Sequence, residues 1–269
     1  MRCRYRGLSI RSPALDRQVA SIDKSQELAM IGPLPRDSAD QSGCGQEGPN
    51  MSAAIVIRLL ASADRAAVRR LCGDTADRGE PVEGFFSDRL LVVDLLTRYY
   101  TDLDRSCSWV AESDGQLAGY VLAAADSRAV ERAARLRIAP AALIGAVLRG
   151  ALGRAETWRM IRAARANVRR LATRRPFTDA AYPAHLHINL DVRFRSHGLG
   201  GDLLEAALRR LRQTPAAGVH ASVRADSIRA CRFFETHGFA VVHRDALTFP
   251  VSGGTELREV LLYGLSFQH

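Results

Sequence analysis

Lysine is almost absent from this chain. Of its 38 basic residues only Lys24 is a lysine, so the formal net charge of +9 comes almost entirely from arginine. Aromatic residues make up only 6% of the chain, which is few for the stacking platforms that bind single-stranded nucleic acid. Arginine and alanine in this excess are typical of GC-rich codon usage. The charge alone therefore does not predict a nucleic-acid partner.

Long apolar runs are missing too. The longest candidate spans residues 138–148, which is too short to cross a membrane. The basic N-terminus is not followed by the apolar core of a secretory signal. The five cysteines are odd in number and lack the spacing of a metal site. These absences predict a reduced cytoplasmic protein with no disulfide framework, no membrane partner and no bound metal.

Two parts of different character divide the chain. Hydrophobic residues make up 47% of it, enough for a sizeable core. Residues 1–50 show no sustained periodicity and are polar toward their end, which predicts a disordered leader. An alternative is that translation starts at Met51 and that the leader is a misassigned extension. Residues 51–269 are then expected to form one domain.

An arginine-rich stretch, residues 126–178, interrupts this domain. It carries 13 arginines against three acidic residues. Helices are expected near 127–137, 140–150 and 155–172. We interpret the stretch as an amphipathic insertion with solvated arginines; a lid, a homodimer contact and, less favoured, a polyanion site are the alternatives. The apolar stripe expected to pack on the core in the last helix is Trp158, Ile161, Ala164, Val168 and Leu171.

The most informative stretch is a strand, a loop and a helix over residues 184–213. In the strand, Leu186, Ile188 and Leu190 alternate with polar residues, so the two sets face opposite ways. A basic loop with glycines follows, and a helix with leucines on one face begins near Leu199. Unpaired N–H groups at a helix N-terminus, approached over glycine, can hold a diphosphate.

This loop carries a family resemblance. Arg195-Ser-His-Gly198-Leu-Gly200 resembles the Arg/Gln-x-x-Gly-x-Gly/Ala loop by which GCN5-related N-acetyltransferases (GNAT) hold the pyrophosphate of acetyl-CoA. Residues 223–239 are similar to that family's second coenzyme-binding helix. The resemblance covers residues 180–264 and, more loosely, 54–124. It implies the GNAT fold: an α/β fold with a mixed central β-sheet flanked by helices.

The resemblance also implies an activity and a set of coenzyme contacts. The activity is transfer of an acetyl group from acetyl-CoA to a primary amine of a small molecule or a protein. The backbone at the end of the central strand would bind the pantetheine arm, and the loop would bind the diphosphate. The cofactor-binding residues implied in this way are Leu190, Asp191, Val192, Arg195, Ser196, His197, Gly198, Leu199, Gly200, Gly201, Ser227 and Phe234.

His185 and His187 are the candidate catalytic residues. Histidine titrates near neutral pH, so it can accept the proton that an ammonium must lose before it attacks. His-Leu-His before this loop resembles arylalkylamine N-acetyltransferases, in which paired histidines serve deprotonation. Tyr182 to His187, with Gly218-Val219-His220, resembles the acetyltransferase-like domain that accompanies O-GlcNAcases. A structural role for both histidines is the alternative; a metal site, with Asp191 and His197 as further ligands, is a weaker one.

Phe234 departs from the family pattern. The usual acid at this position is a tyrosine, and a phenyl ring cannot protonate a departing thiolate. Tyr182, Cys231, Tyr263 and water are the other candidates. The departure motivates an alternative function, a non-catalytic acyl-CoA-binding or interaction module on the same fold. A dinucleotide-dependent oxidoreductase is disfavoured, because Leu203 stands where the third glycine of GxGxxG belongs.

The remaining elements follow from periodicity and turn residues. Helical spacing extends over residues 84–100, and Asp114-Gly115 predicts a tight hairpin turn. Glu80 and Glu83 lie between the first two helices and are candidate contacts for the acceptor, or else solvated carboxylates. The other expected elements are a strand over 55–59, a helix capped by Ser62 or Asp64, strands over 108–112, 116–124 and 218–224, a helix over 226–237, and a hairpin of 239–249 with 257–265.

Overall fold

The computed structural model describes residues 55–267 apart from 77–78, 85, 196–197 and 252–253, and only the backbone of 171–180. These residues all belong to one unit, Gly48–His269. The predictions for residues 1–50, Ser196 and His197 lie outside the described residues.

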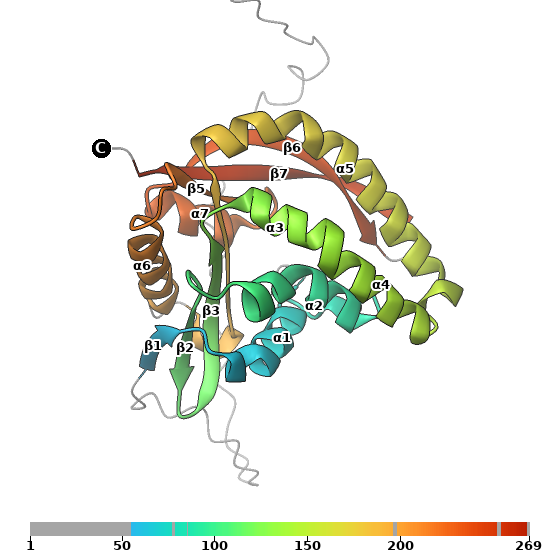
Figure 1. Ribbon diagram of the computed structural model, residues 1–269, viewed down its shortest axis with the longest axis horizontal. Helices are drawn as coiled ribbons and strands as arrows, with labels where there is room; N and C mark the ends of the chain where they lie inside the picture. Colours follow the sequence, from blue (N-terminus) through green and yellow to red (C-terminus); the bar gives the residue numbers. More distant parts are fainter. Residues whose placement is uncertain (1–54, 77–78, 85, 196–197, 252–253, 268–269) are drawn as a thin grey trace, which may run out of the picture. The chain divides into compact units, whose positions relative to one another are not determined.

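Within the described residues a seven-stranded sheet has the order β1-β2-β3-β4-β5-β7-β6 (Figure 1). Neighbouring strands are antiparallel except β4 and β5, which run parallel. The predicted α/β class with a mixed sheet is confirmed. The strands are β1 (Ile55–Leu59), β2 (Trp109–Ser113), β3 (Gln116–Ala124), β4 (Ala184–Leu190), β5 (Gly218–Arg224), β6 (Ala240–Val251) and β7 (Gly254–Ser266).

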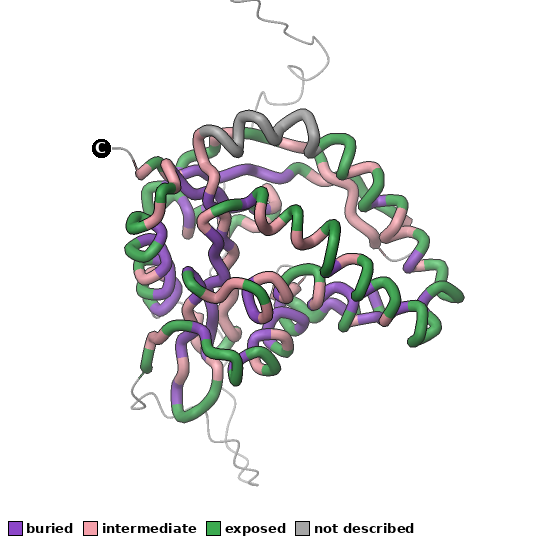
Figure 2. Tube along the Cα trace, in the orientation of Figure 1, coloured by how far each residue is buried: buried purple, intermediate pink, exposed green. Residues whose placement is uncertain are grey.

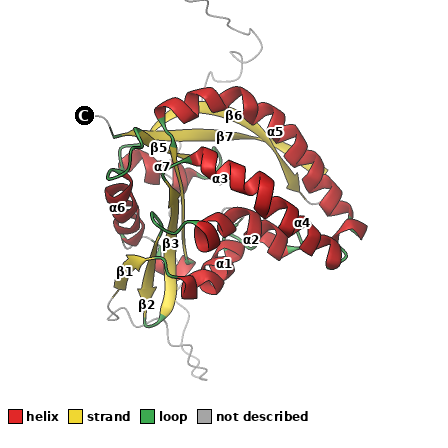
Figure 3. Cartoon of the chain, in the orientation of Figure 1, coloured by secondary structure: helices red, strands yellow, loops and turns green. Residues whose placement is uncertain are grey.

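Helices flank this sheet (Figure 3). The α-helices are α1 (Arg65–Asp74), α2 (Arg89–Arg98), α3 (Ser127–Ala133), α4 (Ala139–Leu148), α5 (Ala155–Ala181), α6 (Leu199–Leu211) and α7 (Ile228–Thr236). Two π-helical turns, η3 (Tyr99–Leu103) and η4 (Ala134–Ile138), extend α2 and join α3 to α4. Short 3-10 turns are η1 (Ser62–Asp64), η2 (Val82–Gly84), η5 (Ala151–Gly153) and η6 (Val192–Phe194).

The two faces of the sheet belong to different cores. On one face, Leu186 of β4 packs with Leu203 and Leu204 of α6. On the other face, Tyr120 and Leu122 of β3 pack with residues of α1 and η3. β3 is buried over residues 118–124 (Figure 2). The alternation predicted for β4 is therefore confirmed, because its leucine and histidine positions face opposite cores.

Local sequence signals are confirmed at two elements. The leucine face of α6 is buried throughout, from Leu199 to Leu211. Asp114 and Gly115 both have positive φ angles, 51° and 73°, as a type I′ hairpin turn requires. That turn joins β2 to β3, with Ser113 opposite Gln116.

The second helix begins later than its spacing predicted. α2 starts at Arg89 rather than at residue 84, because the Asp88 carboxylate accepts a hydrogen bond from the Leu91 N–H and caps the helix there. The same carboxylate pairs with Arg149 from the end of α4, 2.9 Å away. A buried acid thus determines the helix start and joins the insertion to α2.

The predicted packing face of the third insertion helix is wrong. Trp158 and Val168 are exposed, whereas Ala163 is buried. The reason is that α5 follows the edge strand β6, where Asn167 exchanges two 2.8 Å hydrogen bonds with the backbone of Thr248. The side-chain amide takes the place of a neighbouring strand, which protects the sheet edge. The helix also runs on to Ala181, beyond the predicted end at 172.

Candidate active site

The parallel strands β4 and β5 pair over a short distance only. Their described register contains Ala184 opposite Val219 and His185 opposite His220, and no later pair. Beyond His185, the edge of β4 that faces β5 therefore carries backbone N–H and C=O groups that this ladder does not use. Such an edge can bind an extended, amide-bearing chain in the manner of an added strand.

His185 is hydrogen-bonded to a tyrosine from a distant helix. Tyr100 lies in η3, and its hydroxyl oxygen is 2.9 Å from His185 Nδ1. Burial raises the pKa of Tyr100 above its ordinary value, so the hydroxyl keeps its proton at neutral pH. The contact orients the imidazole and couples its tautomer to the direction of the tyrosine O–H.

His187 lies on the same face of β4 in a more apolar setting. The residue as a whole is half-buried, but its Nε2 is shielded from solvent and has no hydrogen-bond partner in the described part of the chain. Its ring centroid lies 5.4 Å from that of Tyr100 and 6.0 Å from that of Tyr120. Burial lowers the pKa of His187 to about 4, since the imidazolium would lose its hydration. His187 is therefore neutral at pH 7.

A third histidine completes this cluster, and sequence analysis did not assign it to the site. The ring centroids of His220 and His185 are 5.1 Å apart. His220 Nδ1 lies 2.7 Å from the Tyr182 carbonyl oxygen, so this nitrogen carries the hydrogen and donates it. The sequence alone places His220 as the third residue of the predicted strand 218–224. Its proximity to His185, the second residue of β4, follows from the parallel register of the two strands.

The loop after β4 is held by arginines. Asp191 pairs with Arg193, which lowers the pKa of that carboxyl. Arg195 Nε donates to the Leu190 carbonyl oxygen at 3.2 Å. The Arg195 guanidinium lies against Gly79, since a Cβ there would come within 2.8 Å of it. Among the predicted coenzyme contacts of this loop whose side chains the structure describes, only Val192 is largely exposed.

The glycines at the N-terminus of α6 have different surroundings. Gly198 occupies the N-cap position with φ of +79°, and a Cβ built on it meets nothing within 4 Å. A Cβ on Gly200 would instead lie 3.2 Å from the Phe233 ring and 3.3 Å from Leu190. Gly201 faces His237, and Leu199 is buried. Gly198 therefore borders open space, whereas Gly200 permits close packing of helix on strand.

Two of the predicted coenzyme contacts, Ser227 and Phe234, lie at the start of α7 and within it. Ser227 occupies the N-cap position but makes no side-chain cap hydrogen bond. Phe234 is buried, with its ring 5.7 Å from that of Tyr263. Tyr263 is buried as well and donates its hydroxyl hydrogen to Glu235 at 2.8 Å. Of the substitute acids, Cys231 is also buried in this core, so both it and Tyr263 are engaged in packing.

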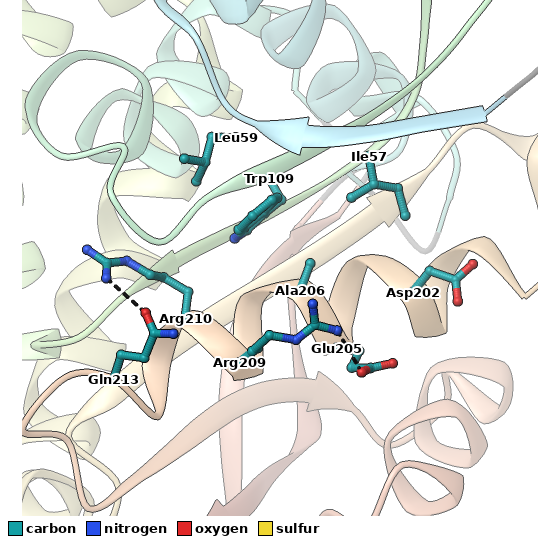
Figure 4. A pocket seen from close by; sticks show the side chains of 9 residues that line it. All are labelled: Ile57, Leu59, Trp109, Asp202, Glu205, Ala206, Arg209, Arg210 and Gln213. Atoms are coloured by element: carbon teal, nitrogen blue, oxygen red, sulfur yellow. Dashed lines mark hydrogen bonds and ion pairs between the residues drawn. The ribbon is translucent and has the colours of Figure 1, made fainter.

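A cavity of about 600 Å³ lies elsewhere, between α6 and the first two strands (Figure 4). Trp109 and Ile57 form its apolar side, while Arg209 and Glu205 of α6 form its charged side. None of the predicted site residues lines this cavity. Its position gives it no part in the chemistry of the histidine cluster.

The described residues contain no group of three or more His, Cys, Asp or Glu arranged to hold a metal ion. No helix among them has both the length and the apolar character that a membrane crossing requires.

The fold and the glycine loop agree with one family of enzymes. Residues 82–239 match the model of the acetyltransferase (GNAT) family. This match covers more than half of the chain, which therefore belongs to that family. Acetyl-CoA is the co-substrate of GNAT acetyltransferases, and the predicted cofactor is confirmed on this basis.

Solved structures show the same fold. A protein named SsHAT covers 80% of this chain and 100% of its own, with 24% identity and a TM-score of 0.57. YncA, a putative acetyltransferase from Salmonella typhimurium determined with acetyl-CoA, covers 81% of this chain and 96% of its own, with 14% identity and a TM-score of 0.51. A polyamine N-acetyltransferase from Drosophila melanogaster covers 80% of this chain and 100% of its own, with 16% identity and a TM-score of 0.51. The likenesses to arylalkylamine acetyltransferases and O-GlcNAcase-type domains stay predictions.

Proposed function

We propose that this chain transfers an acetyl group from acetyl-CoA to a primary amine of a small molecule or a protein. The observation that carries the proposal is the position of His185. It is bonded to Tyr100 and flanked by His187 and His220 where β4 and β5 cease to pair. A proton acceptor therefore lies beside the strand edge that can bind the coenzyme arm.

His185 is the better general base of the predicted pair. In the tautomer that donates Nδ1–H to the Tyr100 oxygen, Nε2 is the basic nitrogen of His185 and would take the amine proton directly or through water. The imidazolium formed keeps its hydrogen bond to Tyr100. His187, with a pKa of about 4, is a weak base, and its role in this scheme is to pack the base in place.

The coenzyme is assigned to the two surfaces that fit it. When bound, acetyl-CoA supplies a thioester carbonyl open to attack by the amine. Backbone N–H groups near Leu190 are suited to bind the arm and polarise that carbonyl. The N-terminus of α6 at Gly198, with its open space and positive dipole end, is suited to the diphosphate.

Replacing the histidines one at a time tests the base. His185→Gln should lower kcat about 100-fold, while the Kd for acetyl-CoA stays unchanged, because a general base acts after the coenzyme binds. His187→Gln should lower kcat by a smaller factor. Thiol release measured with an accepted amine, beside calorimetric acetyl-CoA binding, separates the two effects. Wild-type turnover in His185→Gln would remove this residue from the mechanism.

A matched pair of variants at Gly198 tests the diphosphate site. Asparagine tolerates left-handed backbone, and aspartate does so while also capping helices. Gly198→Asp adds a negative charge beside the bound diphosphate and should weaken acetyl-CoA binding about tenfold relative to Gly198→Asn. Both variants should melt near the wild-type temperature. Equal affinity of the two would contradict the site.

A second function rests on Phe234. A buried phenyl ring at the position of the family's usual acid supports a module that binds acyl-CoA without turning it over. Acetyl-CoA binding without thiol release, across a panel of small amines and amine-bearing peptides, would favour this second function over catalysis.

A further inference from the structure

Helix α4 has its large apolar side chains on the outside. The residues that it buries against α2 are small, Ala142 and Ala146. Its solvent side carries Ile144, 63% exposed, and Leu148, 83% exposed. A helix that packs by alanine and exposes leucine and isoleucine reverses the usual arrangement, so its outer side is a candidate docking surface.

This surface extends beyond α4 at both ends. Leu136 of η4 precedes α4 by three residues, and Leu152 of η5 follows it. Trp158 borders it, with its indole N–H donated to the Leu152 carbonyl. In Figure 1 these elements form the lower right end of the unit. We name this surface the α4 outer face and define it by the exposed side chains of Leu136, Leu143, Ile144, Val147, Leu148 and Leu152.

The segment that carries the α4 outer face is net basic. Residues 131–156 contain five arginines against Glu131 and Glu156, and Arg149 is already paired with Asp88. Arg132, Arg135 and Arg137 are exposed and form no ion pair within the described residues. The occupant must therefore offer apolar contact and negative charge together.

The need for both apolar contact and negative charge distinguishes three possible occupants. A second copy, related by a two-fold axis, would bring the arginines against themselves. Nucleic acid offers phosphates, but its base faces are stacked on one another, so a whole row of leucine, isoleucine and valine side chains finds little apolar surface there. An anionic bilayer offers both, because apolar side chains reach the boundary between headgroups and acyl chains while arginines bind the lipid phosphates.

We propose that the α4 outer face docks this protein on the surface of an anionic lipid bilayer. Ile144 and Leu148, the most exposed apolar side chains of α4, enter the headgroup–acyl boundary, and Arg135 and Arg137 bind lipid headgroups. The predicted absence of a membrane partner followed from the lack of a spanning segment; surface docking needs none. The proposal does not depend on the acetyltransferase activity.

Vesicle co-sedimentation of the full chain tests the proposal. Vesicles of phosphatidylcholine containing phosphatidylglycerol should bind the protein, and pure phosphatidylcholine vesicles should bind it weakly. Ile144→Glu with Leu148→Glu should weaken binding roughly 100-fold. Arg135→Glu with Arg137→Glu should weaken it about 30-fold on anionic vesicles only, and added salt should weaken the wild type.

The matched control places glutamates on apolar positions elsewhere. Val56 and Leu257 are 53% and 55% exposed and lie on β1 and β7. Val56→Glu with Leu257→Glu should leave vesicle binding unchanged. All of these side chains are exposed, so thermal melts of the variants should match the wild type and exclude misfolding.

Three results would overturn the proposal. The first is equal binding to both vesicle types, and the second is equal loss of binding in the control variant. The third is no vesicle binding at all, in which case light scattering with size exclusion identifies the occupant. A dimer that Ile144→Glu with Leu148→Glu dissociates would assign the face to a second copy, and a monomer would leave the face without the proposed role.

Discussion

The replacement His187→Leu should make the protein less sensitive to acid. The pKa of His187 is about 4 in the folded protein, against an ordinary value of 6.5. Between these values the unfolded chain binds the proton more readily than the folded one. The folded state therefore keeps this stability above pH 6.5 and loses it as the pH falls toward 4. Leucine cannot be protonated, so the variant should lack this loss.

The size of the effect follows from the two pKa values. Their difference, 6.5 − 4, is 2.5 units, which at about 1.36 kcal/mol per unit gives an upper limit of roughly 3 kcal/mol. Between pH 7 and pH 5 the linkage relation gives about 2 kcal/mol. At pH 7 the variant should stay within about 1 kcal/mol of the wild type, because leucine has a similar volume and leaves no unpaired Nε2.

Urea unfolding at a series of pH values between 5 and 7 measures this difference. The free energy of unfolding of the wild type should fall by about 2 kcal/mol more than that of His187→Leu. His237→Gln, a change at an exposed histidine, is the control and should follow the wild type. Parallel curves for His187→Leu and wild type would show that the imidazole is hydrated and titrates in its ordinary range.

Four other variants, at three positions, test packing and proton supply. Gly200→Val should destabilise the fold by about 2 kcal/mol in a thermal melt, because a Cβ at this position already meets the Phe233 ring at 3.2 Å and the γ-carbons add to the overlap; no change would contradict the close packing. Asp88→Ala should cost about 3 kcal/mol, since Arg149 and the α2 cap lose their partner, and Asp88→Asn, which keeps the cap, should cost less. Phe234→Tyr should speed thiol release if thiolate departure limits turnover; an unchanged rate would place the acid elsewhere.

Elements with a strong local signal were predictable from the sequence. The leucine spacing of α6, the alternation along β4 and the Asp114-Gly115 turn depend on residues within a few positions of one another. Backbone geometry couples such neighbours directly, so periodicity and turn chemistry determine the outcome. The glycine loop before α6 belongs to the same class, and with it the family was identifiable.

Contacts between distant residues were decided only by the tertiary structure. Tyr100 reaches His185 across 85 positions of sequence, and the helical spacing that contains Tyr100 gave no sign of this partner. His220 joins the cluster because β4 and β5 meet in one register. The packing faces of α4 and α5 were not predictable either. Which face a helix buries depends on the surface that it meets, and for α5 that surface is the polar backbone edge of β6, which no periodicity within the helix encodes.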